Sequence, residues 1–326
     1  MKAIQLSRFG GPEVLGVVDL PTPVPGRGEA LIRIRAAGIN FFEVLMRQDR
    51  YAVTPELPMV PGVEVTGVVE ALGEDVAFPG IGTRVAVPLF AIGRSSGGYA
   101  EYVAADAASL VPLPDGLAFE DVTALMVQGL TALHLIRQSP PKARTVLVTA
   151  AAGGVGSLLI QMAKGAGAKL VIAAAGSREK LSLARDLGAD VMADYTESGW
   201  AGRVRAATGG DGVDIAYDFV GGSVTKACLD ALAPKGELVF GALNRFALTP
   251  AELEHMFFDN QSLRGFALLP LLTPAGLKTD LSNLFGQATE GGLKVMQGGC
   301  YRLDQAAEAH RALENRQTMG KVVLVL

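Results

Sequence analysis

A glycine-rich segment at residues 150–156 is the part of the chain best suited to hold a ligand. It reads Ala-Ala-Ala-Gly-Gly-Val-Gly and lies between a predicted strand at 145–149 and a predicted helix at about 155–165. Glycines let the backbone approach a pyrophosphate, and a helix N-terminus offers free N–H groups and a positive dipole end. A tight turn without a ligand is the alternative. We expect a dinucleotide to contact Ala152, Gly153, Gly154, Val155 and Gly156.

The residues after the next predicted strand indicate which dinucleotide binds. An acidic side chain about 20 residues beyond the glycines would bind the ribose 2′-hydroxyl of NAD. This chain instead has Gly176-Ser177-Arg178-Glu179-Lys180. Ser177 can donate to a 2′-phosphate, and Arg178 and Lys180 supply positive charge, so the segment favours NADPH. Glu179 weakens this interpretation, and ordinary solvated charges at a helix start are the alternative.

Strands and helices alternate through the part of the chain that contains both segments. Strands are predicted at 145–149, 169–174, 213–219 and 237–241, and helices at about 155–165, 178–187 and 223–232. This alternation predicts an α/β domain with a parallel sheet covered by helices. We expect this domain to comprise residues 123–262.

The first hundred residues have a different character, with short β-type runs separated by Gly and Pro. The runs lie at 30–35, 64–71, 84–88 and 99–104. They predict an all-β domain over residues 1–122. The segment Gly320–Leu326 predicts a further strand, and we expect residues 263–326 to complete this first domain.

Composition narrows the class of partner. The 326 residues include 29 Lys and Arg against 33 Asp and Glu, a net charge of −4. This balance gives no reason to expect nucleic acid or an anionic membrane and favours a small molecule. Cys228 and Cys300 are too few for a disulfide framework, and the first eight residues lack the apolar core of a secretory signal. We therefore expect a cytoplasmic protein.

Several motifs, in order along the whole chain, carry a resemblance to a known family. They are Ala37-Gly38-Ile39-Asn40, Pro61–Val69, Gly97–Val103, Gln128–Ala132, Ala150–Gly156 and Gly320-Lys321. With them the chain resembles the zinc-free quinone oxidoreductase (zeta-crystallin-like) branch of the medium-chain dehydrogenase/reductase superfamily. The resemblance implies a GroES-like β domain, a Rossmann domain with a doubly wound parallel sheet, and a homodimer.

The resemblance also implies further contacts to NADPH. They are Thr131, Tyr195, Val220, Gly241, Ala242, Leu243, Asn244, Phe266 and Leu268. Core packing is the alternative for Val220 and Phe266, a surface turn for Asn244, and a strand-end aromatic for Tyr195.

The sequence predicts that no metal is bound. Zinc members of the superfamily use Cys and His ligands from the β domain, whereas residues 1–133 contain neither residue type. Gly62-Val63-Glu64 stands where those members have Gly-His-Glu, and two cysteines cannot form a four-Cys site. The three histidines, His134, His255 and His310, are interpreted as surface or core residues.

Without a Lewis acid, a conjugated acceptor is the expected substrate. Hydride added to a quinone or an α,β-unsaturated carbonyl spreads charge toward an oxygen, which modest hydrogen-bond donors can stabilise. The resemblance suggests Asn40 and Tyr51 for that role and Arg47 for an acidic group. A partly buried aromatic is the alternative for Tyr51, and a structural ion pair is the alternative for Arg47. Leu45 replaces a Tyr of many relatives and makes the pocket more apolar.

Two other functions stay open on the sequence. The same hydride step could reduce an enoyl thioester, which would need no change of fold. A non-catalytic NADPH-binding protein with a structural or regulatory role is the second alternative.

Overall fold

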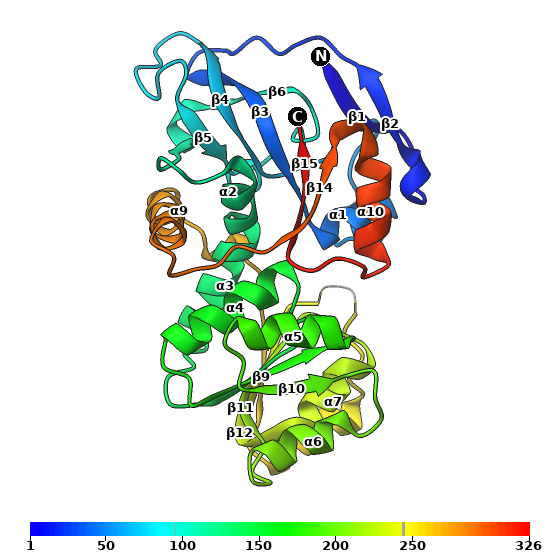
Figure 1. Ribbon diagram of the computed structural model, residues 1–326. Helices are drawn as coiled ribbons and strands as arrows, with labels where there is room; N and C mark the ends of the chain where they lie inside the picture. The colour runs from blue at the N-terminus through cyan, green and yellow to red at the C-terminus, as the bar shows by residue number, and fades with distance from the viewer. Residues whose placement is uncertain (95, 243–244) are drawn as a thin grey trace. The chain divides into compact units, whose positions relative to one another are not determined.

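The computed structural model describes residues 1–94, 96–242 and 245–326 and divides into two compact units. Unit 1 contains Met1–Leu130 and Leu271–Leu326, and unit 2 contains Thr131–Pro270. Figure 1 shows the two units with their helices and strands. The domain limits expected from the sequence, 122/123 and 262/263, stay a prediction. Among the described residues, no helix has both the length and the apolar character needed to span a bilayer.

Unit 1 is built on a seven-stranded sheet in the order β14-β15-β3-β4-β5-β7, with β6 also pairing with β3. A separate two-stranded sheet is formed by β1 and β2. The strands are β1 (Lys2–Leu6), β2 (Leu15–Asp19), β3 (Glu29–Ile39), β4 (Val65–Leu72), β5 (Arg84–Val87), β6 (Tyr102–Asp106), β7 (Val111–Pro112), β14 (Gln297–Arg302) and β15 (Lys321–Val325).

Strand β3 is the centre of this sheet because it pairs with three others. It is antiparallel to β4, β6 and β15, and Val322 of β15 lies opposite Ile39. The predicted terminal strand is therefore confirmed, and it lies in the sheet of the N-terminal segment. Apolar side chains of β1, β3, β5 and β15, among them Ile4, Ile32 and Leu324, form the buried core. The fold of unit 1 thus joins the two ends of the chain.

Helices accompany this sheet, and the sequence did not predict the first of them or the two in the C-terminal segment. They are α1 (Phe41–Arg47), α2 (Phe119–Leu125), α9 (Pro274–Thr289) and α10 (Ala306–Glu314). The prediction of an all-β region was wrong at α1, because seven residues give little helical periodicity. The start of α1 has the spacing of a capping box, in which the Glu43 carboxylate accepts from the Asn40 N–H at 2.7 Å and the Glu43 N–H donates to the Asn40 backbone carbonyl at 3.0 Å. Met126 separates α2 from the next helix, α3 (Val127–Gln138).

Unit 2 contains a six-stranded sheet whose strands are all parallel, in the order β10-β9-β8-β11-β12-β13. This is the doubly wound Rossmann order, so the predicted α/β class is confirmed. The strands are β8 (Thr145–Val148), β9 (Leu170–Ala175), β10 (Val191–Asp194), β11 (Val213–Asp218), β12 (Leu232–Phe240) and β13 (Ser262–Gly265). The sequence did not predict β10 and β13, each of which has four residues.

Helices connect these strands in two directions from β8. The helices α4 (Gly154–Gly165) and α5 (Arg178–Asp186) lead from β8 toward β10, and α6 (Trp200–Ala207), α7 (Ser223–Ala231) and α8 (Pro250–Phe258) lead the other way to β13. Right-handed crossovers place the two sets on opposite faces of the sheet. Figure 1 shows α5 on one side of β9 and β10 and α6 on the other. All six strands consequently end at one edge, and the direction changes between β8 and β11.

Candidate functional site

The C-terminal edge of the unit 2 sheet gathers nearly all of the predicted cofactor residues. Ala152–Gly156 follow β8, Gly176–Lys180 follow β9, Tyr195 follows β10, Val220 follows β11, Gly241 and Ala242 follow β12, and Phe266 and Leu268 follow β13. Thr131 lies instead within α3, and Leu243 and Asn244 lie outside the described residues. Ligands of open α/β sheets bind at this edge, beside the point where strand order reverses.

The glycine-rich turn after β8 presents backbone donors at the start of α4. The Ala151 N–H donates to the Ala174 carbonyl at 3.2 Å, and the Gly153 N–H donates to the Ala150 carbonyl at 2.8 Å. The N–H groups of Gly154, Val155 and Gly156 follow at the first turn of the helix, where no intrahelical acceptor exists for them. These donors and the helix dipole are suited to an anion such as a pyrophosphate.

Gly156 is required by the close packing of α4 on this turn. A Cβ at this position would lie 2.4 Å from the Ala150 carbonyl oxygen and 2.8 Å from the Ala151 Cα. Both neighbours are backbone atoms that cannot move aside. A larger residue would push the helix N-terminus away from the strand that precedes it.

A buried carboxylate, which sequence reasoning missed, holds the neighbouring turn. Asp218 Oδ1 accepts hydrogen bonds from the Thr149 hydroxyl at 3.1 Å, the Val220 N–H at 2.9 Å and the Gly221 N–H at 3.2 Å. Its Oδ2 accepts from the Thr225 hydroxyl at 2.6 Å. Asp218 thus fixes the end of β8 to the turn that carries Val220. Its position at the end of a predicted strand was the available signal.

The segment after β9 has the polar groups that the sequence indicated. Ser177 is the N-cap of α5, and its hydroxyl oxygen accepts from the Lys180 N–H at 3.3 Å. Arg178 is exposed. The pKa of Glu179 is lowered, first by its own backbone N–H and then by the Ser177 hydroxyl. The Ser177 hydroxyl therefore interacts with the Glu179 carboxylate as well as with the Lys180 N–H.

Tyr195 packs directly over the same segment. A Cβ added to Gly176 would lie 3.0 Å from the Tyr195 ring, and the Tyr195 N–H donates to the Ala175 carbonyl at 3.2 Å. The structure therefore brings Gly176 and Tyr195 together at the ends of β9 and β10. Glycine is needed here because a side chain would displace the ring.

Unit 1 contains a buried polar cluster of Asn40, Glu43, Glu64 and Lys321. Asn40 Nδ2 donates to Glu64 Oε1 at 2.8 Å, and its backbone N–H donates to Glu43 Oε2 at 2.7 Å. Lys321 Nζ donates to Asn40 Oδ1 at 2.8 Å and forms an ion pair with Glu64 Oε1. The Lys321 side chain is 1% exposed and that of Glu64 is 0% exposed. Glu64 Oε2 also accepts from the Val127 N–H at 2.8 Å.

This cluster limits what Asn40 can do. Its amide nitrogen donates to Glu64 and lies 3.4 Å from Glu43 Oε2, and its amide oxygen accepts from Lys321. The side chain is therefore engaged at both ends and acts as a cap and bridge for the cluster. Val63, next to Glu64, is buried and apolar. Within the described ranges, no three or more His, Cys, Asp or Glu side chains are grouped so as to hold a metal ion.

Arg47 lies in a structural ion pair, which was the alternative left open by the sequence. Its side chain is 1% exposed, Nη1 donates to the Gly10 carbonyl at 2.7 Å, and Nη2 binds Glu314 at 2.7 Å. These contacts fix α1 to α10. They occupy the ends of the guanidinium that would otherwise bind an acidic substrate group.

Tyr51 is the catalytic candidate whose polar group is not engaged. Its half-buried ring contacts that of Phe42, with 5.4 Å between the centroids and 34° between the planes. Partial burial raises the pKa of the phenol, so the group stays protonated in neutral solution. As far as the chain is described, the Tyr51 hydroxyl has no hydrogen-bond partner, so it is available as a donor.

Glu43, which belongs to the cluster, and His310 are two buried titratable groups with strongly shifted pKa values. Burial raises the pKa of Glu43 to about 7, against the opposing effects of the Asn40 N–H and Lys321. Burial, together with the charge of Arg47, lowers the pKa of His310 to about 3. The Tyr99 hydroxyl lies 3.1 Å from His310 Nε2, and burial raises its pKa further from neutrality. Sequence reasoning gave none of these three a functional role, although the Asn-x-x-Glu spacing indicates Glu43.

Comparison with known proteins shows similarity along the whole chain. Residues 26–115 match the family described as alcohol dehydrogenase GroES-like domain, and residues 154–285 match the family described as zinc-binding dehydrogenase. The chain is 37% identical to a quinone oxidoreductase of Pseudomonas aeruginosa, and the match covers 99% of both chains.

Solved structures agree with these matches. A mycobacterial protein complexed with NADPH has 36% identity and a TM-score of 0.89, and both chains are covered completely. The Escherichia coli quinone oxidoreductase complexed with NADPH has 30% identity and a TM-score of 0.91, again with complete coverage of both chains.

The shifted pKa values of Glu43 and His310 predict opposite effects of pH on stability. The raised pKa of Glu43 gives stability that is lost as pH rises from 4.5 to about 7. The lowered pKa of His310 gives stability that is lost as pH falls from 6.5 to about 3. In Glu43→Gln the His310 effect is unmasked, so the free energy of unfolding should fall more steeply on acidification between about pH 6.5 and 5, by up to ~1.4 kcal/mol per pH unit.

The measurement is urea-induced unfolding at a series of pH values, compared between the variant and the unmodified protein. Glu70→Gln, which removes an exposed carboxylate of β4, is the control. If Glu43→Gln and the unmodified protein lose stability with pH in the same way, the raised pKa of Glu43 is contradicted.

Proposed function

Because the chain belongs to the quinone oxidoreductase branch of the medium-chain dehydrogenase/reductase superfamily, we propose that it transfers hydride from NADPH to a quinone or an activated alkene without zinc. Its full-length relatives are oxidoreductases, and two of the similar structures contain NADPH. We thus infer for this chain a reaction of the kind for which those relatives are named, and we propose in addition that the reaction needs no zinc.

The buried ammonium of Lys321 is the observation that carries the zinc-free part. It contacts both Asn40 Oδ1 and Glu64 Oε1, so a cation of the protein already neutralises the carboxylate nearest to Val63. A zinc ion at this place would need soft or imidazole ligands and would repel Lys321. This chemistry of the donor groups supports a reaction without a Lewis acid, although one matching family is named for zinc binding.

The edge of the unit 2 sheet fits the cofactor. The open N–H groups of Gly154, Val155 and Gly156 would hold the pyrophosphate, and Ser177 and Arg178 would hold the 2′-phosphate. Tyr195, Val220 and Phe266, with Thr131 and Leu268, are proposed as further contacts. NADPH would supply the hydride, and the protein supplies binding and orientation.

The acceptor needs a hydrogen-bond donor where negative charge develops. Tyr51 is proposed for this role, because its phenol is protonated and open, whereas Asn40 and Arg47 are engaged within unit 1. Asn40 then has a positioning role, since it holds Glu64 and Lys321 at the start of α1. We also propose that the protein is a cytoplasmic homodimer, which the composition and the family resemblance support.

The direct test follows NADPH absorbance with purified protein and a panel of ortho- and para-quinones, 2-alkenals and crotonyl-CoA. We expect turnover of quinones or 2-alkenals that is unchanged after dialysis against a strong zinc chelator, with less than stoichiometric zinc in the protein. Turnover of crotonyl-CoA alone would indicate the enoyl-thioester activity instead. Tight NADPH binding with no turnover of any acceptor would indicate a non-catalytic role, and loss of activity on chelation would contradict metal independence.

Tyr51→Phe tests the proposed donor. Removing the hydroxyl should lower kcat about 10²-fold, as the loss of one donor to a developing oxyanion does, and should leave the Kd of NADPH unchanged. Steady-state kinetics with the best acceptor and fluorescence titration with NADPH give the two numbers. Tyr102→Phe, at a half-buried tyrosine of β6, is the matched control, and an equal effect of both variants would refute the role of Tyr51.

The choice between NADPH and NADH is tested by the pair Ser177→Asp with Arg178→Ala. The double variant removes both proposed partners of the 2′-phosphate and places a negative charge beside it. NADPH binding should therefore weaken by about tenfold or more and NADH should be favoured, because each charge-assisted hydrogen bond to the phosphate is worth about 1.5–3 kcal/mol. Affinities for both cofactors are measured by titration. Arg185→Ala removes an exposed charge near the other end of α5 as the control, and an unchanged preference in the double variant would exclude this segment.

A further inference from the structure

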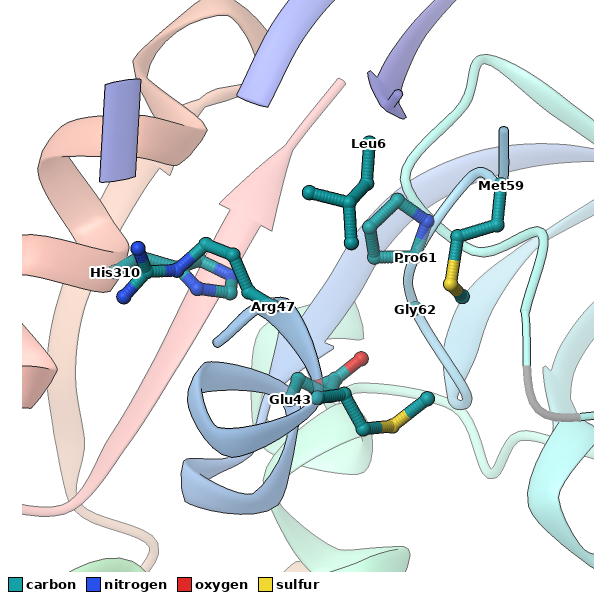
Figure 2. A pocket seen from close by; sticks show the side chains of 8 residues that line it. Leu6, Glu43, Arg47, Met59, Pro61, Gly62 and His310 are labelled. Atoms are coloured by element: carbon teal, nitrogen blue, oxygen red, sulfur yellow. The ribbon is translucent and has the colours of Figure 1, made fainter. Parts of the chain in front are cut away.

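A small cavity lies inside unit 1, between α1, α10 and the segment around Pro61. Its volume open to the centre of a water-sized sphere is about 10 Å³, which is the size needed for one water molecule. Leu6, Glu43, Met46, Arg47, Met59, Pro61, Gly62 and His310 line it. Figure 2 shows the side chains of Glu43, Arg47 and His310 around this space, opposite Leu6, Met59 and Pro61.

Three polar atoms of the lining residues are buried without a partner. They are Glu43 Oε1, Arg47 Nε and His310 Nδ1, and none of them has a partner with hydrogen-bond geometry among the described residues, although Glu43 is close enough to Tyr99 to raise the pKa of its phenol. Buried polar atoms are nearly always satisfied by protein or by ordered water. Three such atoms around one cavity therefore point to a bound group that the protein chain does not supply.

The other polar atoms of the same residues are already engaged. Glu43 Oε2 accepts from the Asn40 N–H, Arg47 Nη1 and Nη2 bind Gly10 and Glu314, and His310 Nε2 pairs with the Tyr99 hydroxyl. The three unpartnered atoms are consequently the ones that remain for a ligand. One of them is a fixed donor, the Arg47 Nε–H, and the others can accept.

We propose that one water molecule is bound in this cavity, where it accepts from the Arg47 Nε–H and links Glu43 Oε1 with His310 Nδ1. Water balances the donors and acceptors, because it has two lone pairs and two hydrogens and typically makes about three bonds when buried. In this arrangement His310 Nδ1 accepts from the water, and His310 Nε2 carries the proton and donates to the Tyr99 hydroxyl, 3.1 Å away.

The charges around the cavity exclude an ion. The charge of Arg47 is balanced by Glu314, so an anion would gain no uncompensated partner and would face Glu43. A cation would face Arg47 instead. The remaining lining by Leu6, Met46 and Met59 is apolar and leaves room for a single small neutral molecule.

The bound water joins two elements that are far apart in the sequence. Glu43 and Arg47 belong to α1, and His310 belongs to α10. Together with the Arg47–Glu314 ion pair, the water fixes the buried face of α1, which is capped by Asn40. This inference concerns unit 1 alone, so its test does not depend on the proposed activity.

A high-resolution crystal structure of the unmodified protein is the first test. We expect one density peak at hydrogen-bonding distance from Arg47 Nε and from both Glu43 Oε1 and His310 Nδ1. An empty cavity overturns the proposal. A direct hydrogen bond from Tyr99 or His310 to Glu43 Oε1, with no water, also overturns it.

A double-mutant cycle of Glu43→Leu and His310→Phe is the second test. Each single variant removes one partner of the water and leaves the other with an incomplete bond, so the double variant should add little further loss. Each substitution should increase the unfolding equilibrium constant by some factor. We expect the factor for the double variant to be at least about fivefold smaller than the product of the factors for the two single variants. The control cycle combines Glu43→Leu with Thr123→Val, a buried residue that does not line the cavity, and its effects should multiply. Effects that multiply in both cycles contradict the water bridge, and the crystal structure decides if a variant does not fold.

Discussion

The arrangement of unit 1 depends on the ion pair between Lys321 and Glu64. Both side chains are almost completely buried, and a buried charge without its partner is strongly unfavourable, by about 3–5 kcal/mol when one partner is removed. Asn40 bonds to both partners, and the Val127 N–H donates to the second oxygen of Glu64. The position of α1, the start of α3 and the register of β15 against β3 are therefore coupled through one pair of charges.

Most of the layout of unit 2 could be predicted from the sequence because its signals are local. A strand, a glycine turn and a helix follow one another within about twenty residues of the chain, and parallel strands must end at the same edge of the sheet. The pattern therefore gives the place of the glycine turn at the start of α4 and of Ser177 and Arg178 at the start of α5. The strands β10 and β13 escaped prediction because their sequences, Val-Met-Ala-Asp and Ser-Leu-Arg-Gly, contain few β-branched residues, whereas β8 has the same length but reads Thr-Val-Leu-Val. Asp218 was missed because its role depends on Thr149, which only the pairing of β8 with β11 brings to it, as well as on Thr225 of α7.

The polar groups of unit 1 could not be predicted in the same way. Lys321 and Glu64 are separated by 257 positions, and Tyr99 and His310 by 211. No local pattern indicates such pairs, whereas the capping box of Asn40 and Glu43 spans three positions and is readable. The sequence did indicate Asn40, Arg47 and Tyr51 as candidates by resemblance. Burial and hydrogen bonding distinguish the three candidates. The polar group of Tyr51 has no partner among the described residues, whereas the side chains of Asn40 and Arg47 are bound by other groups of unit 1.

The strand β15 also has a consequence for the order in which the chain folds during synthesis. Unit 2 is continuous, from Thr131 to Pro270, so its sheet can form once that stretch has left the ribosome. Unit 1 begins the chain but needs β15, because Lys321 neutralises Glu64 and Val322 pairs with Ile39. Until β15 emerges, residues 36–39 of β3 lack the strand that pairs with them in the folded protein, and Glu64 lacks its buried cation. The strands that precede unit 2 in the chain are therefore completed after it, and part of the edge of β3 stays exposed until residues 321–325 emerge.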